Sequence, residues 1–528
     1  MGVPLTDWFL TAQERGNPDS SIPTWTVGNT AEALVHGQTY FGRLVTEVES
    51  LGAGDILFFT DWRGDPDERL RDDGPTTAEL LSGAARRGVI VKGLLWRSHL
   101  DKLQYSEEEN RSLADAVAKA GGEVLLDQRV RRGGAHHQKL IVIRRKGDAA
   151  GDIAFAGGID LCHSRRDDES HRGDPQAVAM AKAYGDRPPW HDVQLALHGP
   201  VVGALDLTFR ERWRDPAPLD QHGPISTIED KLKGADLSAD KLPDQPPDPP
   251  GDGPLAIQVN RTYPAMRPAY GFAKLGEQTI ARGYTKAIKR ARRLIYLEDQ
   301  YLWSREVAQL FADALQKNRD LHLIAVVPRH PDVDGRFALP PNQVGREHAI
   351  SLCRKAAPER VHIFDVENHE STPVYVHAKV CVVDDVWVSV GSDNFNRRSW
   401  THDSELSCAI LDETIDGRSP ADPAGLGDGA RRFARDLRLR LLREHLDAGD
   451  DDTGLLDPEE IVRTVNASAD ALRDWHRGGE KGPRPSGRLV PHETQRLSWF
   501  TRFWATPAYQ LIYDPDGRPW RARRAGDW

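Results

Sequence analysis

Two short segments, far apart in the chain, carry the same pair of reactive side chains. The first contains His137 and Lys139, and the second contains His377 and Lys379, each just before an apolar run. Residues two apart in a strand point to the same face, so each segment presents one imidazole beside one ammonium group. Two such segments facing each other would form a pocket with two histidines and two lysines. That pocket suits an anionic phosphate ester and suits a zinc site poorly, because lysine is a cation at neutral pH.

The two segments lie within a longer internal repeat, which predicts the elements that position them. Each copy reads as helix, strand, helix, strand, a short third strand, the His-Lys strand, a glycine-containing turn, a last strand and a closing helix. Nearly continuous apolar strands alternating with helices predict an α/β fold with sheets buried on both faces. We expect two pseudo-symmetric halves, each a mixed sheet flanked by helices, packed as one bilobal unit.

The expected boundaries follow from the repeat and from a change in composition. The N-terminal half covers 1–214 and the C-terminal half covers 256–447. Between them lies a Pro-rich linker, 215–255, that we expect to be extended and mobile. Residues 448–528 form a C-terminal extension with an Arg/Trp-rich tail, which we expect to pack across the two halves.

Composition narrows the class of protein. The chain has 528 residues, of which 39% are hydrophobic and 28% charged, and a net charge of −10. No apolar run approaches the roughly 20 residues of a membrane span, and the N-terminus lacks a basic region followed by an apolar one. We therefore expect a cytoplasmic protein, and the net charge argues against a general nucleic-acid binder. The four cysteines form no CxxC pair, so buried free thiols are expected.

The paired segments resemble the HxKxxxxD motifs of the phospholipase D superfamily. The second copy is complete, with Asp384 five residues after Lys379 and then the turn 391–394 (Gly-Ser-Asp-Asn). The first copy is similar to the eukaryotic-type branch, as are three further stretches: Phe155 to Leu161, Trp190 to Val193 and Tyr296 to Tyr301. The resemblance covers roughly residues 30–447, and two copies inside a matching repeat make chance similarity very improbable.

The resemblance implies a mechanism through a covalent phosphohistidine, which splits a difficult displacement into two easier steps. One histidine must be neutral to attack phosphorus, and the other must donate a proton to the leaving alcohol and then act as a base toward water. By analogy with the family, His137 is the expected nucleophile and His377 the expected general acid/base, although the near symmetry of the motifs leaves the reverse assignment open. Lys139 and Lys379 would stabilise charge in the transition state. This scheme requires no metal or other cofactor.

Further residues are expected around the histidines. Each imidazole needs an acceptor for its far nitrogen, and the resemblance implies that Asp192 holds His377 and Glu405 holds His137. Glycines of the turns would let the backbone approach the phosphate, and neutral or acidic neighbours would line it. The expected phosphate-binding residues are Gly158, Asp160, Ser392 and Asn394, with Asp384 as structural support. His136, next to His137, should face away and be structural.

Two features depart from the motif pattern. Arg144 stands where the first copy should carry the counterpart of Asp384, and Asp148 or Asp152 could substitute for that acid. The run of cations that begins at Arg144 reads as a solvent-facing hairpin tip, so we expect Arg144 to lie outside the pocket. Residues 163–189 form an extra charged loop whose cluster 165–169 reads as solvated, with gating of the substrate as the alternative.

Three functions compete. The first is a metal-independent phosphodiesterase that cleaves phospholipids or transfers the phosphatidyl group, working as a monomer at a membrane surface. The second is a nuclease of the same superfamily, against which the acidic composition argues mildly. The third is a non-catalytic paralogue that binds phosphate or lipid, which only Arg144 favours. An apolar or a basic surface leading to the histidine pair would discriminate between the first two.

Overall fold

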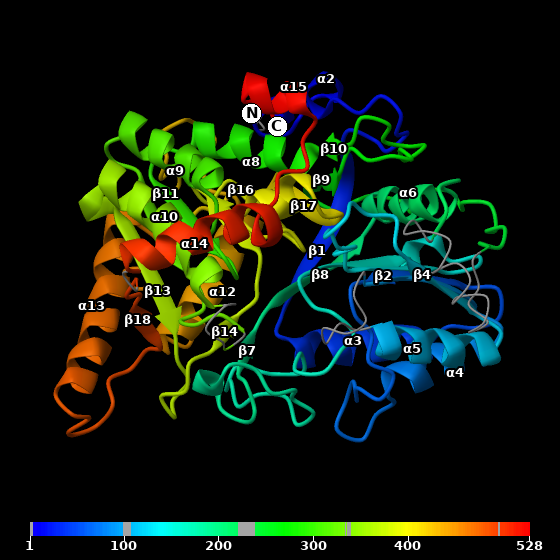
Figure 1. Ribbon diagram of the computed structural model, residues 1–528, viewed down its shortest axis with the longest axis horizontal. Helices are drawn as coiled ribbons and strands as arrows, with labels where there is room; N and C mark the ends of the chain where they lie inside the picture. The colour runs from blue at the N-terminus through cyan, green and yellow to red at the C-terminus, as the bar shows by residue number, and fades with distance from the viewer. Residues whose placement is uncertain (1–3, 99–106, 220–237, 333, 335–338, 495–496) are drawn as a thin grey trace.

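The computed structural model describes residues 4–98, 107–219, 238–332, 334, 339–494 and 497–528, and these form two similar sheets joined edge to edge. Strands β1 (Thr26–Val35) and β9 (Leu255–Tyr263) pair antiparallel at the centre of the joined sheet (Figure 1). On the N-terminal side the order from the edge is β4 (Glu123–Asp127), β3 (Ile90–Trp96), β2 (Ile56–Asp61), β5 (Leu140–Arg144), β6 (Ile153–Gly157), β8 (Val193–His198) and β1. On the C-terminal side the order from the edge is β18 (Leu489–Pro491), β13 (Val361–Val366), β12 (His322–Val326), β11 (Leu294–Glu298), β15 (Val380–Val383), β16 (Trp387–Gly391), β17 (Glu405–Asp412) and β9.

The two sheets repeat one another strand for strand, as the internal repeat predicted. In each, three neighbouring strands are parallel (β2, β3 and β4, or β11, β12 and β13). The strand that follows a His-Lys segment then pairs antiparallel to the first of these, β5 with β2 and β15 with β11. The mixed α/β fold with two pseudo-symmetric halves is therefore confirmed.

Helices cover both faces of each sheet, because successive strand residues point to opposite faces and both sets are apolar. In β2, Leu57 and Phe59 pack under one helical layer, whereas Ile56 and Phe58 pack under the other. The first layer consists of α3 (Gly37–Glu49), α4 (Thr77–Arg86) and α5 (Glu107–Lys119), and its C-terminal counterparts are α8 (Thr279–Arg290), α9 (Arg305–Lys317) and α10 (Leu339–Ala356). The opposite faces are covered by α6 (Val201–Trp213) and α12 (Arg432–Leu446).

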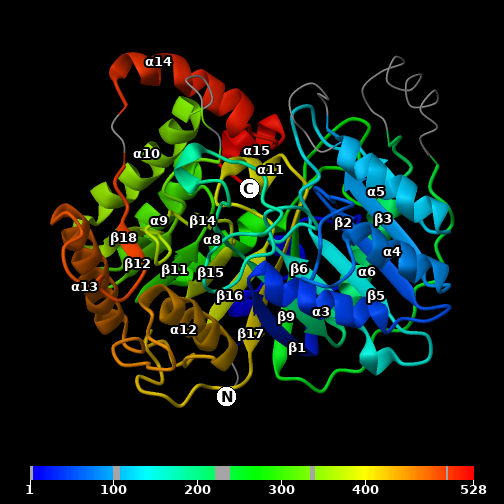
Figure 2. The same ribbon diagram turned by 90° about the horizontal axis from the view of Figure 1, so that it is seen from below.

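The C-terminal extension packs mainly on the C-terminal half. Strand β18 (Leu489–Pro491) pairs antiparallel with β13 and extends the sheet, and α13 (Pro458–Arg477) packs against that edge. Helix α14 (Trp499–Ala508) lies beside α10 at the rim of the molecule (Figure 2) and is followed by η4 (Tyr509–Tyr513) and α15 (Trp520–Ala525). Hydrogen bonds also reach the N-terminal half: Arg131 donates to the carbonyl of Gly517 (2.9 Å), and Arg488 donates to the carbonyl of Glu169.

The described part of the linker is extended but held in place, which corrects the expectation of a mobile segment. The carbonyl oxygens of Pro243, Pro246 and Pro247 accept hydrogen bonds from buried arginines of the N-terminal half. The side chain of Gln245 donates to the carbonyl of Gly203 in α6 (3.0 Å). Linker residues 220–237 lie outside the described residues.

Arg144 is buried, so its predicted exposure is wrong, although Lys146 and Gly147 do form an exposed hairpin tip and Arg144 lies outside the pocket, as expected. Its side chain is 1% exposed and forms ion pairs with Asp152 (2.7 Å) and Asp206 (2.9 Å). The guanidinium group also donates to the carbonyls of Pro246 and Pro247. Arg144 is therefore an internal tie between the hairpin, α6 and the linker, on the far end of β5 from the His-Lys segment.

Two further expectations have clear outcomes. All four cysteines are free and buried, as predicted. Among the helices of the described residues, none combines the length and the apolar character needed to cross a bilayer.

Candidate functional site

The two His-Lys segments reach the site through crossed strand contacts between the halves. His136 forms a β-bridge with Ser404, and Val376 pairs with His191 where β14 (Tyr375–Val376) meets β7 (Trp190–His191). In each case the residue before a motif histidine pairs with the residue before an acid of the opposite half. This crossing therefore places each motif histidine beside an acid of the opposite half.

The distances confirm this arrangement. His137 Nδ1 lies 2.9 Å from Glu405 Oε2, and His377 Nδ1 lies 2.6 Å from Asp192 Oδ2. Both acids are fully buried. A carboxylate on Nδ1 fixes the ring orientation and the tautomer, which leaves Nε2 as the nitrogen for chemistry at phosphorus. His136 turns away, as expected, with Nε2 2.6 Å from the hydroxyl of Thr60.

The two lysines lie beside the imidazoles in nearly equivalent positions. Each donates to the backbone carbonyl of the histidine two residues before it, Lys139 to His137 (3.0 Å) and Lys379 to His377. Lys139 also lies 3.2 Å from Asp160 Oδ1, whereas Lys379 donates to the amide oxygen of Gln300 (3.4 Å). Lys139 is thus paired with Asp160, whereas for Lys379 the charge of Asp192 opposes the lowering of its pKa by burial.

The electrostatics follow from burial and from these cations. Burial lowers the pKa of both His137 and His377 well below the ordinary value, and the adjacent lysine of each motif lowers it further. The lysines also act across the interface, since Lys379 lowers the pKa of His137 and Lys139 lowers that of His377. The histidines and lysines of the two halves thus share one electrostatic field, with both imidazoles neutral at neutral pH.

Burial also lowers the pKa of Lys379, to about 8. For Asp160, burial opposes ionisation, yet Lys139, the hydrogen bond from Asp61 and Arg165 together hold its pKa below the ordinary value. Its neighbour Asp61 has a raised pKa, because of burial and the charge of Asp160. These two acids therefore hold one negative charge between them beside Lys139.

Two of the expected phosphate-binding residues lie against the acids that hold the histidines. The hydroxyl of Ser392 donates to Glu405 Oε2 (2.5 Å) and so supports the acid that holds His137. At Gly158, an added Cβ would lie 2.1 Å from Asp192 Oδ1. Glycine is needed there to make room for the acid that holds His377. Asn394 is buried in the second turn, at the position equivalent to Asp160.

Asp384 is a buried support, as expected, and lies at the far end of β15 from the lysine. Its carboxylate accepts three backbone N–H groups, from Arg292, Arg293 and Leu294, at 2.7–2.9 Å. Burial raises its pKa to about 6 despite these bonds. These contacts fix the start of β11, so Asp384 supports the backbone on which the site is built.

Sequence reasoning missed three residues that border the site. The ring of Trp190 lies 4.8 Å from that of His377, and the guanidinium group of Arg165 lies 3.8 Å above Trp190. Gln300 bridges Lys379 to the hydroxyl of Tyr375 (2.7 Å). Trp190 and Gln300 stand inside motif stretches already singled out, which was the available signal. Nothing in the sequence distinguishes Arg165 from its charged neighbours.

The cluster 165–169 is not a solvated loop, contrary to the first of its two readings. Arg166 and Asp167 are buried, and Asp167 accepts the backbone N–H groups of Gly173 (3.0 Å) and Trp190 (2.7 Å). The loop is thereby folded onto the strand that carries Asp192.

A cavity of about 570 Å³ borders the site on the C-terminal side, within the size range of small-molecule pockets. Gln300 and Tyr375, which link it to Lys379, form part of its wall. Arginine and acidic side chains form much of the remainder, among them Arg329, Arg346, Asp365 and Glu367.

Comparisons with known proteins identify the family of this chain. Residues 69–239 match the family described as phospholipase D, and residues 284–418 match that described as cardiolipin synthase, PLD-like domain. Phospholipase D alpha 1 of Vigna unguiculata is 24% identical over 76% of this chain and 62% of its own length. Phospholipase D1 of Schizosaccharomyces pombe is 27% identical over 59% of this chain and 27% of its own length.

The chain thus spans less than two thirds of the length of these curated relatives. Among solved structures, phosphatidylserine synthase of Haemophilus influenzae Rd KW20 superposes with a TM-score of 0.50 at 13% identity. The superposition covers 73% of this chain and 82% of that one, and supports the fold. The two matched families together cover more than half of the chain, one in each half, and the chain belongs to the phospholipase D superfamily.

Proposed function

We propose that this protein is a metal-independent phosphodiesterase that cleaves phospholipids, or transfers their phosphatidyl group to an alcohol, through a phosphohistidine. One observation carries the proposal: two buried imidazoles each face a buried carboxylate of the opposite half and stand beside a lysine. This set provides a nucleophile, an acid/base and two cations for the phosphoryl oxygens. None of the steps below requires a metal ion.

In the first step, Nε2 of His137 attacks phosphorus while the bond from phosphorus to the head-group oxygen breaks. His377 gives its proton to the departing alcohol, and the phosphatidyl group is left on His137. In the second step, His377 removes a proton from water or an acceptor alcohol, whose oxygen attacks phosphorus as the phosphorus–nitrogen bond breaks. Lys139 and Lys379 stabilise the charge on the non-bridging oxygens in both steps.

The low pKa of both histidines fits the start of this cycle. A neutral His137 has the lone pair needed for attack, and the acid on its Nδ1 compensates the positive charge that develops on the ring. His377 must gain a proton before it can donate one. The anionic phosphodiester, placed between the lysines, supplies a negative charge that raises the pKa of His377 in the complex.

A lipid substrate is favoured over a nucleic acid by an exposed apolar surface on the C-terminal extension. Six large apolar side chains of α14, η4 and α15 are each at least 61% exposed: Trp499, Phe500, Phe503, Leu511, Ile512 and Trp520. Arg521 and Arg524 are exposed beside Trp520. Aromatic side chains with flanking arginines are typical of segments that lie in the interface of an anionic membrane. We name these eight residues the C-terminal surface.

The C-terminal surface is tied to helix α11 (Arg397–Thr401), which begins three residues after Asn394. The side chain of Arg398 donates to the carbonyl of Ile512 in this surface (2.9 Å), and its backbone N–H donates to the carboxylate of Asp514 (2.8 Å). A bilayer that holds this surface would therefore lie near the motif turn of the C-terminal half. The phospholipase D relatives point to the same class of substrate.

The test compares two substrates under one set of conditions. We expect release of head group from mixed vesicles of phosphatidylcholine and phosphatidylglycerol, and no cleavage of single-stranded DNA. Cleavage of DNA without cleavage of lipid would establish the nuclease alternative. Binding of vesicles with no turnover of either substrate would establish the non-catalytic paralogue.

The lowered pKa of Lys379 predicts a loss of activity at alkaline pH. Below about 8 the side chain is an ammonium ion, and above it an uncharged amine that no longer stabilises the phosphoryl oxygens. We expect kcat/KM, which reports the free enzyme, to fall as the pH rises through about 8. In Lys379→Arg, whose guanidinium group stays charged, that alkaline limb should move upward. A limb unchanged in this variant would assign it to another group.

The C-terminal surface predicts a separation of membrane binding from chemistry. We expect Trp499→Ser/Phe500→Ser/Phe503→Ser to weaken binding to anionic vesicles by at least about tenfold, because three aromatic side chains no longer enter the interface. Turnover of a short-chain, monomeric phospholipid should be unchanged. Leu275→Ser is the matched control, since Leu275 is 78% exposed and lies outside this surface. Equal loss of vesicle binding in the control would contradict the assignment.

A further inference from the structure

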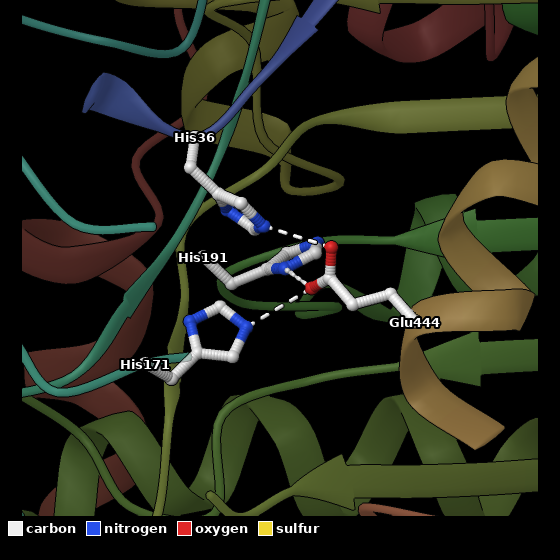
Figure 3. A group of neighbouring side chains, drawn as sticks. All are labelled: His36, His171, His191 and Glu444. Carbon is white, nitrogen blue, oxygen red and sulfur yellow. Dashed lines mark hydrogen bonds and ion pairs between the residues drawn. The ribbon is translucent and has the colours of Figure 1, made fainter. Parts of the chain in front are cut away.

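A second group of buried titratable side chains lies behind the strand that carries Asp192. His36, His171, His191 and Glu444 converge from four separate segments (Figure 3). They come from the end of β1, the extra loop 163–189, β7 and helix α12. Neither the reaction proposed above nor the resemblance gives these four residues a role.

The metal-binding donor atoms of these four residues lie close to one another. Glu444 lies 2.8 Å from His36 Nε2, 3.0 Å from His171 Nε2 and 3.5 Å from His191 Nδ1. All four donor atoms lie within 4.8 Å of one another. Four ligands at about 2.0–2.1 Å from a tetrahedral zinc ion stand roughly 3.4 Å apart. Adjustments of a few tenths of an ångström to about an ångström would therefore bring the set onto one ion.

Two of the histidines are already oriented as metal ligands. The other nitrogen of His191, Nε2, lies 2.7 Å from Glu298 Oε2, and the other nitrogen of His171, Nδ1, lies 3.2 Å from the carbonyl oxygen of Trp190. Ligating histidines characteristically donate their far N–H to a carboxylate or a carbonyl. This tautomer turns a lone pair of each ring toward Glu444.

Without a cation, those lone pairs would face the oxygens of Glu444, which are acceptors too. A divalent cation placed between them would accept the lone pairs of the imidazoles and face the carboxylate of Glu444. Neutral imidazole is the form that binds metal.

We propose that His36, His171, His191 and Glu444 form a structural site for a divalent transition metal, with Zn²⁺ the best match to three imidazoles and one carboxylate. The set is closed, because four protein ligands complete a tetrahedron and leave no open position. The ion therefore takes no part in the attack on phosphorus. This inference stands independently of the substrate and of the phosphohistidine.

The metal site would stabilise the backbone that supports His377. The carbonyl oxygen of His191 accepts the backbone N–H groups of His377 (2.8 Å) and Ala378 (3.1 Å), and Asp192 is the next residue along the chain. A metal on His191 would fix this strand to α12 of the C-terminal half. Through His171 it would also fasten the extra loop, in addition to the apolar contacts that Ala181 and Tyr184 of this loop make with Trp190 and Tyr375.

The test measures metal in the full-length protein. We expect about one equivalent of Zn²⁺ per chain after growth in zinc-supplemented medium and gel filtration. Co²⁺ introduced in its place should give the intense visible absorption of a tetrahedral nitrogen and oxygen site. Glu444→Gln and His171→Asn should each lose the bound ion. His476→Asn is the matched control, because both ring nitrogens of His476 also face carboxylates (2.8 and 3.0 Å) but in a half-buried position.

A variant that fails to fold would leave the comparison to the wild-type protein alone. The metal-free form, prepared by chelation in mild denaturant and refolding, should then regain a higher Tm when Zn²⁺ is added. Three results would overturn the proposal: a zinc content near zero, an octahedral cobalt spectrum, or zinc that survives equally in Glu444→Gln. None of these readouts depends on turnover, so they do not bear on the proposed phosphodiesterase activity.

Discussion

Replacement of His377 by alanine should lower kcat for phospholipid cleavage by at least about 10³-fold, since it removes the proton donor for the leaving alcohol and the base for the second step. His137→Ala should cost as much or more, because no covalent intermediate can form. Head-group release from vesicles measures both. His369→Ala serves as the control, since His369 is exposed and pairs with Asp447 outside the site.

The two variants should differ in what they accumulate. With a phosphodiester whose leaving group needs no proton, His377→Ala retains the nucleophile but lacks the base that activates water. A ³²P label in the phosphoryl group should therefore stay on the protein as an acid-labile adduct in His377→Ala and be absent from His137→Ala. The opposite pattern would make His377 the nucleophile, the assignment that the near-symmetric motifs leave open.

Chelation provides a further check on this chemistry. Brief treatment with EDTA should leave head-group release unchanged, because the attacking and protonating groups are both imidazoles. Immediate loss of turnover on mixing, with recovery on addition of Zn²⁺, would identify a metal ion at the reacting phosphate. The buried four-residue cluster does not compromise this test, since a closed site exchanges its ion slowly.

Arg144→Ala should destabilise the protein by roughly 3–5 kcal/mol, as expected when one partner of a buried ion pair is removed. Asp152 and Asp206 would both lose a cation, and two linker carbonyls would lose their donor. Urea denaturation followed by tryptophan fluorescence gives the free energy of unfolding. In the control Arg43→Ala, a half-buried i,i+4 pair with Glu47 at the surface is lost, and the cost should be no more than about 1 kcal/mol. Similar values for the two variants would mean that Arg144 is not an internal tie.

The duplicated pattern explains why so much of the fold and site was predictable. Two copies of one strand order constrain each other, so an error in one copy shows as a mismatch with the second. The pairing of His137 with Glu405 and of His377 with Asp192 was implied by the resemblance, and the contacts in the structure agree with it. The hydrophobic periodicity of each segment alone would not have predicted that crossing.

Arg144 shows where this reasoning fails. Three adjacent cations and a glycine are a good local signal for an exposed turn, and Arg145 and Lys146 do approach the surface. The partners that draw Arg144 inward are Asp206 and the linker carbonyls, 62 to 103 residues away. Nothing local distinguishes an arginine with such partners from one without them.

The His36 cluster was unpredictable for a related reason. Its ligands are single residues from four segments, with no two of them at a metal-binding spacing in sequence. His171 lies in a loop that charge alone marks as solvated, and Glu444 lies near the end of the helix that closes the C-terminal half. Only the three-dimensional arrangement brings them to one point.

The crossed strand contacts make the site a property of the pair of halves. Each half alone holds a histidine and a lysine whose carboxylate partner lies elsewhere, so neither half contains a minimal catalytic unit. A substitution at Asp192 disables a histidine 185 residues away, and one at Glu405 a histidine 268 residues away. The covalent connection between the halves acts as a tether that sets the effective concentration of each half for the other, so two separately expressed halves would regain a site only at concentrations that replace the tether.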